Sequence, residues 1–428
     1  MKKMLCVFLA VTLMFYSYNI VYADDIIEEE FNQKDLQDII ETSSKTSDEL
    51  TLNSRIAVAF DRNSNKVIWG KDENKRTAMA STTKIMTSII VAENSNLDDI
   101  VTISAKAAGT GGSRLGLKKD DKISMRDLLY GLMLRSGNDA AVAIAEHIGG
   151  DISSFAELMN KKAKELNLKD THFVTPHGLD DPEHYTTAYE LAKITDYALE
   201  NKTIAKVVST KFYTININGY PKDLLNTNEL LGNLNGVNGV KTGFTNNAGR
   251  CLVTSVDRNN FNIITVVLQA DTKKFRTQDS IKLIEYIYEN YTPVNIKTIV
   301  DEKFDEWCNI NKKRITIEKA KTSTIDISYN NLQNDIVVVK KRELDNITIE
   351  INSIFNMQAP VEANTIIGTL KVKVKDEIID TEDVCIKNEI LKKDIRDYFI
   401  KCIKKLKKSM FNSKIDIDFL IFSYNYDL

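Results

Sequence analysis

A change of hydrophobic pattern at Thr292-Pro293 limits the folds open to this chain. Before it, over 51–292, strand-like apolar runs at both ends enclose segments with helical spacing, such as Met125–Leu134. After it, over 295–386, short runs of alternating apolar and polar residues repeat, as in Arg314–Glu318. The sequence therefore predicts an α/β (α+β) domain, with a mixed sheet covered by helices, followed by a small all-β domain.

Composition and charge exclude several classes of protein. A chain of 428 residues has room for two or three domains. Lys and Arg number 57 against 60 Asp and Glu, so no global basic field favours nucleic-acid binding. The five cysteines form no C-x-x-C pair, and the four histidines lack the spacing of a zinc motif. We therefore expect no metal site and mostly free thiols.

The N-terminus has the pattern of a secretory signal peptide. Met1–Lys3 is basic, an apolar run follows, and Val21-Tyr22-Ala23 is a small-x-small cleavage site before two aspartates. This pattern predicts a signal peptide over 1–23, cleaved after Ala23, and an uncleaved membrane helix is the alternative. The acidic, polar segment 24–50 is expected to be a mobile leader. The mature protein should work outside the cytoplasm.

The C-terminal segment 388–410 predicts an amphipathic helix. Its apolar stripe recurs mostly at spacings of three and four and consists of Leu391, Ile395, Tyr398, Phe399, Cys402, Ile403 and Leu406. Eight basic residues less two acidic ones give 391–408 a charge of +6, in a protein of net charge −3. Such a helix suits an anionic membrane surface, and packing against the β domain is the alternative. No role is predicted for the tail 411–428.

Three short motifs carry candidate chemistry. In the first, Ser81-Thr82-Thr83-Lys84, Ser and Lys lie on one face of a helix predicted over 81–93. A serine hydroxyl needs a base to become a nucleophile, and a desolvated lysine can act as that base. At a helix N-terminus the backbone N–H groups also favour a developing oxyanion. Alone this motif is weak, since an exposed N-cap with a solvated lysine also fits it.

The other two motifs lie further along the chain. Ser136-Gly137-Asn138 falls in a turn between two predicted helices, where it presents both polar side chains to a cleft or merely caps a helix. Lys241-Thr242-Gly243 lies on a predicted strand whose edge suits an extended peptide, with the Lys charge and Thr hydroxyl meeting a carboxylate. An exposed edge lysine beside a bulge glycine is the alternative for this motif.

Together and in this order, S-x-x-K, S-x-N and K-T-G resemble the motifs of the active-site serine penicillin-recognising enzymes. Their surroundings are similar to those of the low-molecular-weight penicillin-binding proteins, the D-alanyl-D-alanine carboxypeptidases of peptidase family S11; the similar segments are 80–87, 134–141, 167–189 and 236–243. The resemblance covers about 50–292 closely, and the β domain and terminal helix match the family in kind. Ala78-Met79-Ala80 lacks the proline that commonly precedes Ala-Ser in the family, and Phe244 stands where some members have histidine.

The resemblance implies a serine penicillin-recognising fold that releases the terminal D-alanine of peptidoglycan stem pentapeptides through an acyl-enzyme, without metal or cofactor. Three residues are implied as nucleophile, general base and proton relay, in that order: Ser81, Lys84 and Ser136. Six positions are implied to bind the substrate amide, oxyanion and terminal carboxylate: Asn138, Lys241, Thr242, Gly243, Phe244 and Arg276. The backbone N–H groups of Ser81 and Phe244 would form the oxyanion hole.

The resemblance and the C-terminal helix together imply the partners and the location of the mature enzyme. The expected partners are peptidoglycan stem peptides, β-lactams as covalent inhibitors, and an anionic membrane surface, with no nucleic acid. The enzyme is expected on the outer face of the cytoplasmic membrane, attached peripherally.

Two other functions fit parts of the pattern. A class A β-lactamase shares the three motifs but needs an E-x-x-L-N loop, and Glu165-Leu166-Asn167 has the wrong spacing. A catalytically silent wall-binding protein would share the fold, although all the reactive side chains are present. His172, His177 and His184 suggest a histidine base, but no carboxylate–His–Ser spacing accompanies them. We expect these histidines to order a loop by hydrogen bonding.

Overall fold

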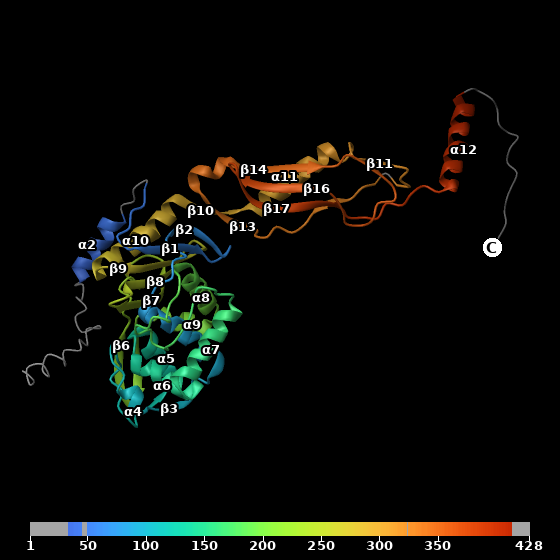
Figure 1. Ribbon diagram of the computed structural model, residues 1–428. Coiled ribbons are helices and arrows are strands. Elements are labelled where there is room, and N and C mark those ends of the chain that lie inside the picture. Colours follow the sequence, from blue (N-terminus) through green and yellow to red (C-terminus); the bar gives the residue numbers. More distant parts are fainter. Residues whose placement is uncertain (1–32, 45–48, 323, 413–428) are drawn as a thin grey trace, which may run out of the picture. The chain divides into compact units, whose positions relative to one another are not determined.

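The computed structural model of the protein describes residues 33–44, 49–322 and 324–412 (Figure 1). The predicted signal peptide, 1–23, and most of the C-terminal tail, 413–428, lie outside the described residues. The chain divides into two compact units after Thr292, the residue at which the sequence pattern changes. Each unit has its own apolar core and is described by itself.

The first unit is built on a five-stranded sheet with the strand order β2-β1-β9-β8-β7. Its strands are β1 (Ile56–Asp61), β2 (Lys66–Lys71), β7 (Val237–Thr245), β8 (Gly249–Arg258) and β9 (Phe261–Ala270). Every neighbouring pair is antiparallel, so the predicted mixed sheet is wrong. Short turns join β1 to β2, β7 to β8 and β8 to β9. The helical layer joins β2 to β7, and β1 pairs antiparallel with β9, with Ile56 opposite Leu268.

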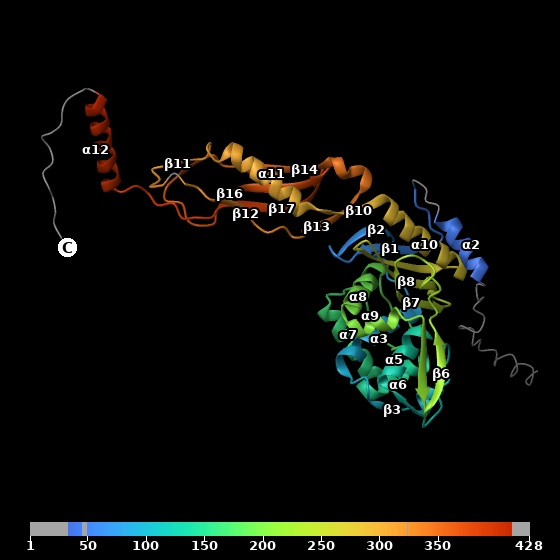
Figure 2. The ribbon, with the colours of Figure 1, turned by 180° about the vertical axis from the view of Figure 1, so that it is seen from behind.

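Helices lie on both faces of this sheet. α8 and α9 pack on one face, and α10 (Lys273–Asn290) lies on the other (Figure 2). The layer that contains α8 consists of α3 (Lys84–Asn94), α5 (Met125–Leu134), α6 (Asn138–Gly149), α7 (Ile152–Glu165), α8 (Ala188–Glu200) and α9 (Lys202–Val208). The predicted helix over 125–134 is confirmed as α5, and the helix predicted to follow Ser136-Gly137-Asn138 is confirmed as α6. Helix α3 is buried along most of its length, which makes it the centre of this layer.

Shorter elements connect these helices and strands. They are η1 (Ala80–Thr83), β3 (Ile100–Thr102), α4 (Ala105–Ala108), β4 (Lys122–Ser124), β5 (Phe212–Ile217) and β6 (Tyr220–Leu225). β3 pairs with β4, and β5 pairs with β6, each as a two-stranded antiparallel ribbon.

Helix α2 (Gln33–Ser43) differs from the mobile leader predicted over 24–50, and that prediction is wrong for these 11 residues. Leu36, Ile39 and Ile40 recur at helical spacing and are buried, because α2 packs against α10 (Figure 1). The segment is polar on average, and that average conceals a short apolar stripe on one face of the helix.

The second unit contains a four-stranded antiparallel sheet in the order β12-β17-β16-β14. Its strands are β12 (Ile327–Tyr329), β14 (Ile347–Ser353), β16 (Thr365–Val374) and β17 (Glu377–Ile386). Two further strand pairs and a short helix complete it: β10 (Tyr291–Asn295) with β13 (Ile336–Lys340), β11 (Thr316–Glu318) with β15 (Asn356–Gln358), and η2 (Lys341–Asn346).

The β domain is confirmed, but the prediction that it is all-β is incomplete. Helix α11 (Ile296–Asn311) packs against β13 and β14. It buries Ile296, Val300 and Phe304, which recur at a spacing of four and cover one end of the sheet's apolar face.

The C-terminal helix α12 (Ile395–Asn412) begins later than the predicted start at 388. The preceding residues are held in extended pairings, because Ile390 bridges to Val361 and the Lys393 N–H donates to the Lys319 carbonyl at 2.7 Å. The apolar side chains of α12 over 395–409 are exposed, with Phe399 at 66% and Leu406 at 62%. Within the ranges that the structure describes, no helix has the length and apolar character to cross a membrane.

Candidate active site

Ser81 lies in η1, the short helix that leads into α3. Lys84, the first residue of α3, is fully buried, whereas Ser81 is half-buried. The Lys84 Nζ donates a 2.7 Å hydrogen bond to the Ser81 Oγ. The structure therefore brings the predicted nucleophile and base into direct contact, the geometry that a serine–lysine pair needs for proton transfer.

Lys84 also joins the first motif to the second. Its Nζ donates to Asn138 Oδ1 at 2.7 Å and to the His177 carbonyl at 3.0 Å. Asn138 Nδ2 in turn donates to the Gly111 carbonyl at 2.8 Å. The ammonium position is thus fixed by three acceptors that come from three separate segments of the chain.

Ser136 lies between α5 and α6, on the turn that delivers Asn138 to Lys84. Its φ of 62° is in the left-handed region, which is uncommon for serine and makes the turn sharp. The side chain of Ser136 is 5% exposed, and the Asn138 N–H donates to the Ser113 carbonyl at 2.7 Å. The second predicted motif is therefore part of the buried site rather than a simple surface cap.

Asp139 is a site residue that the sequence reasoning did not single out. It is fully buried in the first turn of α6, where its carboxylate accepts the backbone N–H groups of Leu115, Gly116 and Leu117 at 2.8–3.0 Å. A carboxylate at a helix N-terminus is favoured by the helix dipole. Asp139 therefore fixes the loop whose neighbouring carbonyls hold Asn138. The available signal was an aspartate at the start of a predicted helix.

Strand β7 carries the third motif along η1. A Cβ on Gly243 would lie 3.1 Å from the Ser81 N, so the strand passes close to the nucleophile, and a larger residue would push η1 by a few tenths of an ångström. Lys241 is 1% exposed and its Nζ donates to the Thr242 carbonyl at 3.0 Å. The alternative of an exposed edge lysine is therefore wrong. Thr242 Oγ1 lies 2.7 Å from Thr227 Oγ1, and Phe244 follows with the Arg250 guanidinium over its ring.

The loop that contains the three predicted histidines packs directly behind η1. Gly178 has a φ of +87°, and a Cβ there would lie 1.9 Å from the Ala80 carbonyl oxygen. His184 Nδ1 accepts the Val174 N–H at 3.0 Å, so its proton is on Nε2, which donates to Thr83 Oγ1 at 2.8 Å. The expectation that the histidines order this loop is confirmed for His184.

Burial keeps two of these imidazoles neutral. Burial, followed by the charge of Lys84, lowers the pKa of His177 to about 3. Burial likewise lowers the pKa of His184 to about 4. His177 Nδ1 accepts the Leu179 N–H at 3.2 Å, which agrees with an uncharged ring. Both histidines therefore act through hydrogen bonds and not through charge.

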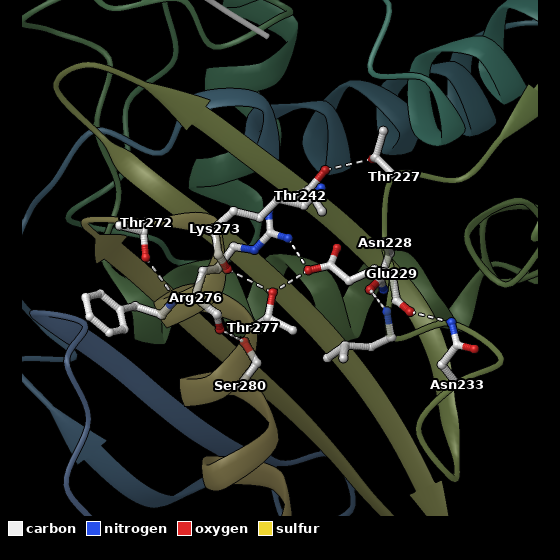
Figure 3. Close-up of polar contacts among 12 residues, drawn as sticks. Thr227, Asn228, Glu229, Asn233, Thr242, Thr272, Lys273, Arg276, Thr277 and Ser280 are labelled. Atoms are coloured by element: carbon white, nitrogen blue, oxygen red, sulfur yellow. Dashed lines mark hydrogen bonds and ion pairs between the residues drawn. The ribbon is translucent and has the colours of Figure 1, made fainter. Parts of the chain in front are cut away.

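Arg276 enters the site from the first turn of α10 (Figure 3). Its side chain is 1% exposed, and its guanidinium Nη2 donates to Glu229 Oε1. Thr277 Oγ1 donates to the same oxygen. The structure thus places the predicted carboxylate-binding arginine in a buried ion pair with a residue, Glu229, that no sequence motif indicated.

The described residues contain no group of three or more His, Cys, Asp or Glu side chains arranged to hold a metal ion. A half-buried serine in contact with a buried lysine, between a helical layer and an antiparallel sheet, defines a serine-type hydrolase.

The sequence model of the D-alanyl-D-alanine carboxypeptidase family, peptidase S11, matches residues 42–272, and that of the penicillin-binding protein 5 C-terminal domain matches residues 309–392. The D-alanyl-D-alanine carboxypeptidase DacF of Bacillus subtilis (strain 168) is 32% identical over 354 residues, which cover 81% of this chain and 88% of that protein. The chain therefore belongs to the D-alanyl-D-alanine carboxypeptidases of peptidase family S11, the low-molecular-weight penicillin-binding proteins.

Solved structures agree with this assignment. The D-alanyl-D-alanine carboxypeptidase DacD of Francisella tularensis superposes with a TM-score of 0.68 at 27% identity, over 80% of this chain and 95% of that one. Penicillin-binding protein 5 of Haemophilus influenzae gives a TM-score of 0.64 at 27% identity, over 81% and 100%. The protein is thus a hydrolytic peptidase of the cell wall, and the carboxypeptidase interpretation is favoured over the class A β-lactamase.

Proposed function

We propose that the protein removes the terminal D-alanine from peptidoglycan stem pentapeptides through an acyl-enzyme on Ser81, and that β-lactams acylate the same serine. The observation that carries this proposal is the 2.7 Å hydrogen bond between Lys84 Nζ and Ser81 Oγ at a buried centre. Burial disfavours the charged form of a lysine. Lys84 in its neutral form can therefore accept the proton of Ser81.

In the acylation step, Ser81 Oγ forms a bond to the carbonyl carbon between the two D-alanines while its proton passes to Lys84. The C–N bond then breaks, and the proton reaches the leaving amine through Ser136, so that free D-alanine departs. In the second step water adds to the ester and gives a proton to Lys84. The bond from Ser81 Oγ to the acyl carbon then breaks, and Ser81 recovers a proton.

Three groups are proposed to hold the substrate during these steps. One N–H of Asn138 Nδ2 donates to the Gly111 carbonyl. We assign the other N–H as a donor to the carbonyl oxygen of a substrate amide. The backbone N–H groups of Ser81 and Phe244 form the oxyanion hole, which the close approach of Gly243 to the Ser81 N supports. Lys241 and Thr242 bind the terminal carboxylate, and Arg276 contributes charge behind them.

The proposed function is tested with the purified enzyme and a synthetic pentapeptide ending in D-Ala-D-Ala. Mass spectrometry should show loss of one D-alanine, and the same peptide with an amidated C-terminus should not be cleaved, because Lys241 and Thr242 then lack their carboxylate. Equal turnover of the two peptides would indicate an endopeptidase. Absence of any acyl-enzyme with penicillin would favour the catalytically silent wall-binding protein.

We further propose that the enzyme is exported with cleavage after Ala23 and acts on the outer face of the cytoplasmic membrane. Helix α12 supports attachment to that surface, because its apolar side chains over 395–409 are exposed while lysines flank them. An exposed apolar stripe beside a dense positive charge suits the plane of an anionic bilayer. Packing of α12 on the β domain would instead bury residues such as Phe399.

A further inference from the structure

Glu229 is a mostly buried carboxylate that forms an ion pair with Arg276 and also feels the charge of Lys273. The Arg276 guanidinium and the Thr277 hydroxyl both donate to Glu229 Oε1 (Figure 3). Burial acts to raise the pKa of Glu229, but the Arg276 charge and the Thr277 hydrogen bond more than offset this and lower it. Glu229 is therefore ionised, and it cancels the charge of Arg276 at close range.

This ion pair lies beside the strand that carries the third motif. The Thr227 hydroxyl bonds to Thr242, and Asn228 Nδ2 donates to the Gly239 carbonyl at 3.0 Å, so residues 227–229 run along β7. The electrostatics agree with this placement. Cys251 is the strand partner of Gly243 in the third motif. Burial raises the pKa of Cys251 to about 12, and the charge of Arg276 opposes this rise, so the Arg276 charge acts at this part of the sheet.

The ion pair is not fully satisfied by hydrogen bonds. Glu229 Oε2 and Arg276 Nε are both buried, and neither has a hydrogen-bond partner among the described residues. Buried polar atoms without partners lower stability, so a desolvated pair of this kind is a weak source of folding free energy. Its position next to Thr242 points instead to an effect on the charge of the substrate site.

We propose that Glu229 is a specificity-determining residue that sets the net charge of the carboxylate subsite. Glu229, when ionised, makes the charge that Lys241 and Arg276 present to the substrate carboxylate one unit less positive than it would be without it. A weaker field also suits turnover, because the released D-alanine carries a carboxylate of its own and tight uniform binding would retain it. This inference rests on the proposed function of Lys241 and Thr242.

The test compares two probes of Ser81 that differ in charge and by one methyl group: benzylpenicillin, which has a carboxylate, and its neutral methyl ester. The second-order rate of acylation is measured with the full chain by intact-protein mass spectrometry. Glu229→Gln keeps the shape of the side chain and removes its charge. We expect it to raise the benzylpenicillin rate by about tenfold and to leave the ester rate within about twofold of wild type. The rise should shrink as salt is added, since added ions screen the new net charge.

Glu285→Gln is the matched control. Glu285 forms a partly buried, two-bond ion pair with Arg258 at the other end of β8, and its loss should leave the ratio of the two rates unchanged. Glu229→Ser is a second neutral variant, used if Glu229→Gln does not fold, and should show the same rise. An unchanged ratio in a folded neutral variant, or an equal fall of both rates, would overturn the proposal. Failure of the wild-type enzyme to be acylated by either probe would refute the proposed function instead.

Discussion

Lys84 connects the first two motifs, because its ammonium donates to both Ser81 and Asn138. Lys84→Ala removes the base and leaves Asn138 Oδ1 without its buried donor. We expect the rate of acylation by penicillin to fall by at least about a thousandfold, as when one member of a nucleophile–base pair is removed. A loss below about tenfold would assign the base to another residue, with Lys241 as the first candidate.

Ser81→Ala should abolish covalent labelling by penicillin. Labelling at a different serine would contradict the assignment of the nucleophile.

The buried histidines make stability depend on pH. In the unfolded chain His177 and His184 take up protons near pH 6.5, whereas in the folded protein their pKa values are about 3 and 4. Their contribution to the free energy of unfolding is complete above pH 6.5 and is lost as the pH falls toward 4, by roughly 1 kcal/mol per pH unit for each histidine. Urea unfolding at pH 6.5 and pH 4.5 measures this loss. His184→Gln should show a smaller loss, and an identical loss would contradict the argument.

At the scale of single residues the sequence predicted the groups that carry chemistry and missed those that support them. Ser81, Lys84 and Lys241 were recognisable because their motifs occur together in one order. Asp139 was missed, since its three partners are backbone N–H groups from a loop distant in sequence. Glu229 was missed because its partner Arg276 lies 47 positions away.

Among the elements, the loop behind η1 packs closely against Ala80, the residue before the nucleophile. Gly178→Ala would set a Cβ 1.9 Å from the Ala80 carbonyl oxygen, so either η1 or the loop must move. We expect the rate of penicillin acylation to fall by more than about tenfold, because small displacements of a nucleophile are costly. Gly150→Ala is the matched control: Gly150 has a similar φ of +83°, but nothing lies within 4 Å of its Cβ position. It should lose only about 1–2 kcal/mol of unfolding free energy and keep its activity. Equal activity in the two variants would contradict the role of this contact.

The sequence predicted the secondary structure of segments whose conformation depends on local residue pattern. The strand-like apolar runs at the start of the first unit, now β1 and β2, and the helices α5 and α6 were predicted because apolar runs and helical spacing are local properties. The antiparallel orientation of the strands could not be predicted from local pattern, since it depends on the pairing of β1 with the distant β9. Helix α2 is likewise stabilised by contact with α10, and its own polar composition gives little indication of it.

For the whole molecule, the proposed anchor can be separated from the catalytic unit. Deletion of 388–428 should leave the rate of D-alanine release unchanged, because the described site lies entirely before Thr292. The truncated enzyme should move to the soluble fraction of cells, whereas the full chain should stay with membranes. Sedimentation with anionic liposomes should weaken as salt rises, because the lysine charges are screened. Equal liposome binding by the two forms would rule out the anchor.

The pairing of β1 with β9 also determines when, during synthesis, this protein can become active. Ser81 and Lys84 leave the ribosome early, but β7 and β9, which complete the sheet around them, follow only at residues 237–270. A nascent chain that ends before β9 leaves the β9-side edge of β1 unpaired, so β7 and β8 have no connection through the sheet to β1. Until about residue 270 has been made, the growing polypeptide is therefore neither a peptidase nor a target for penicillin.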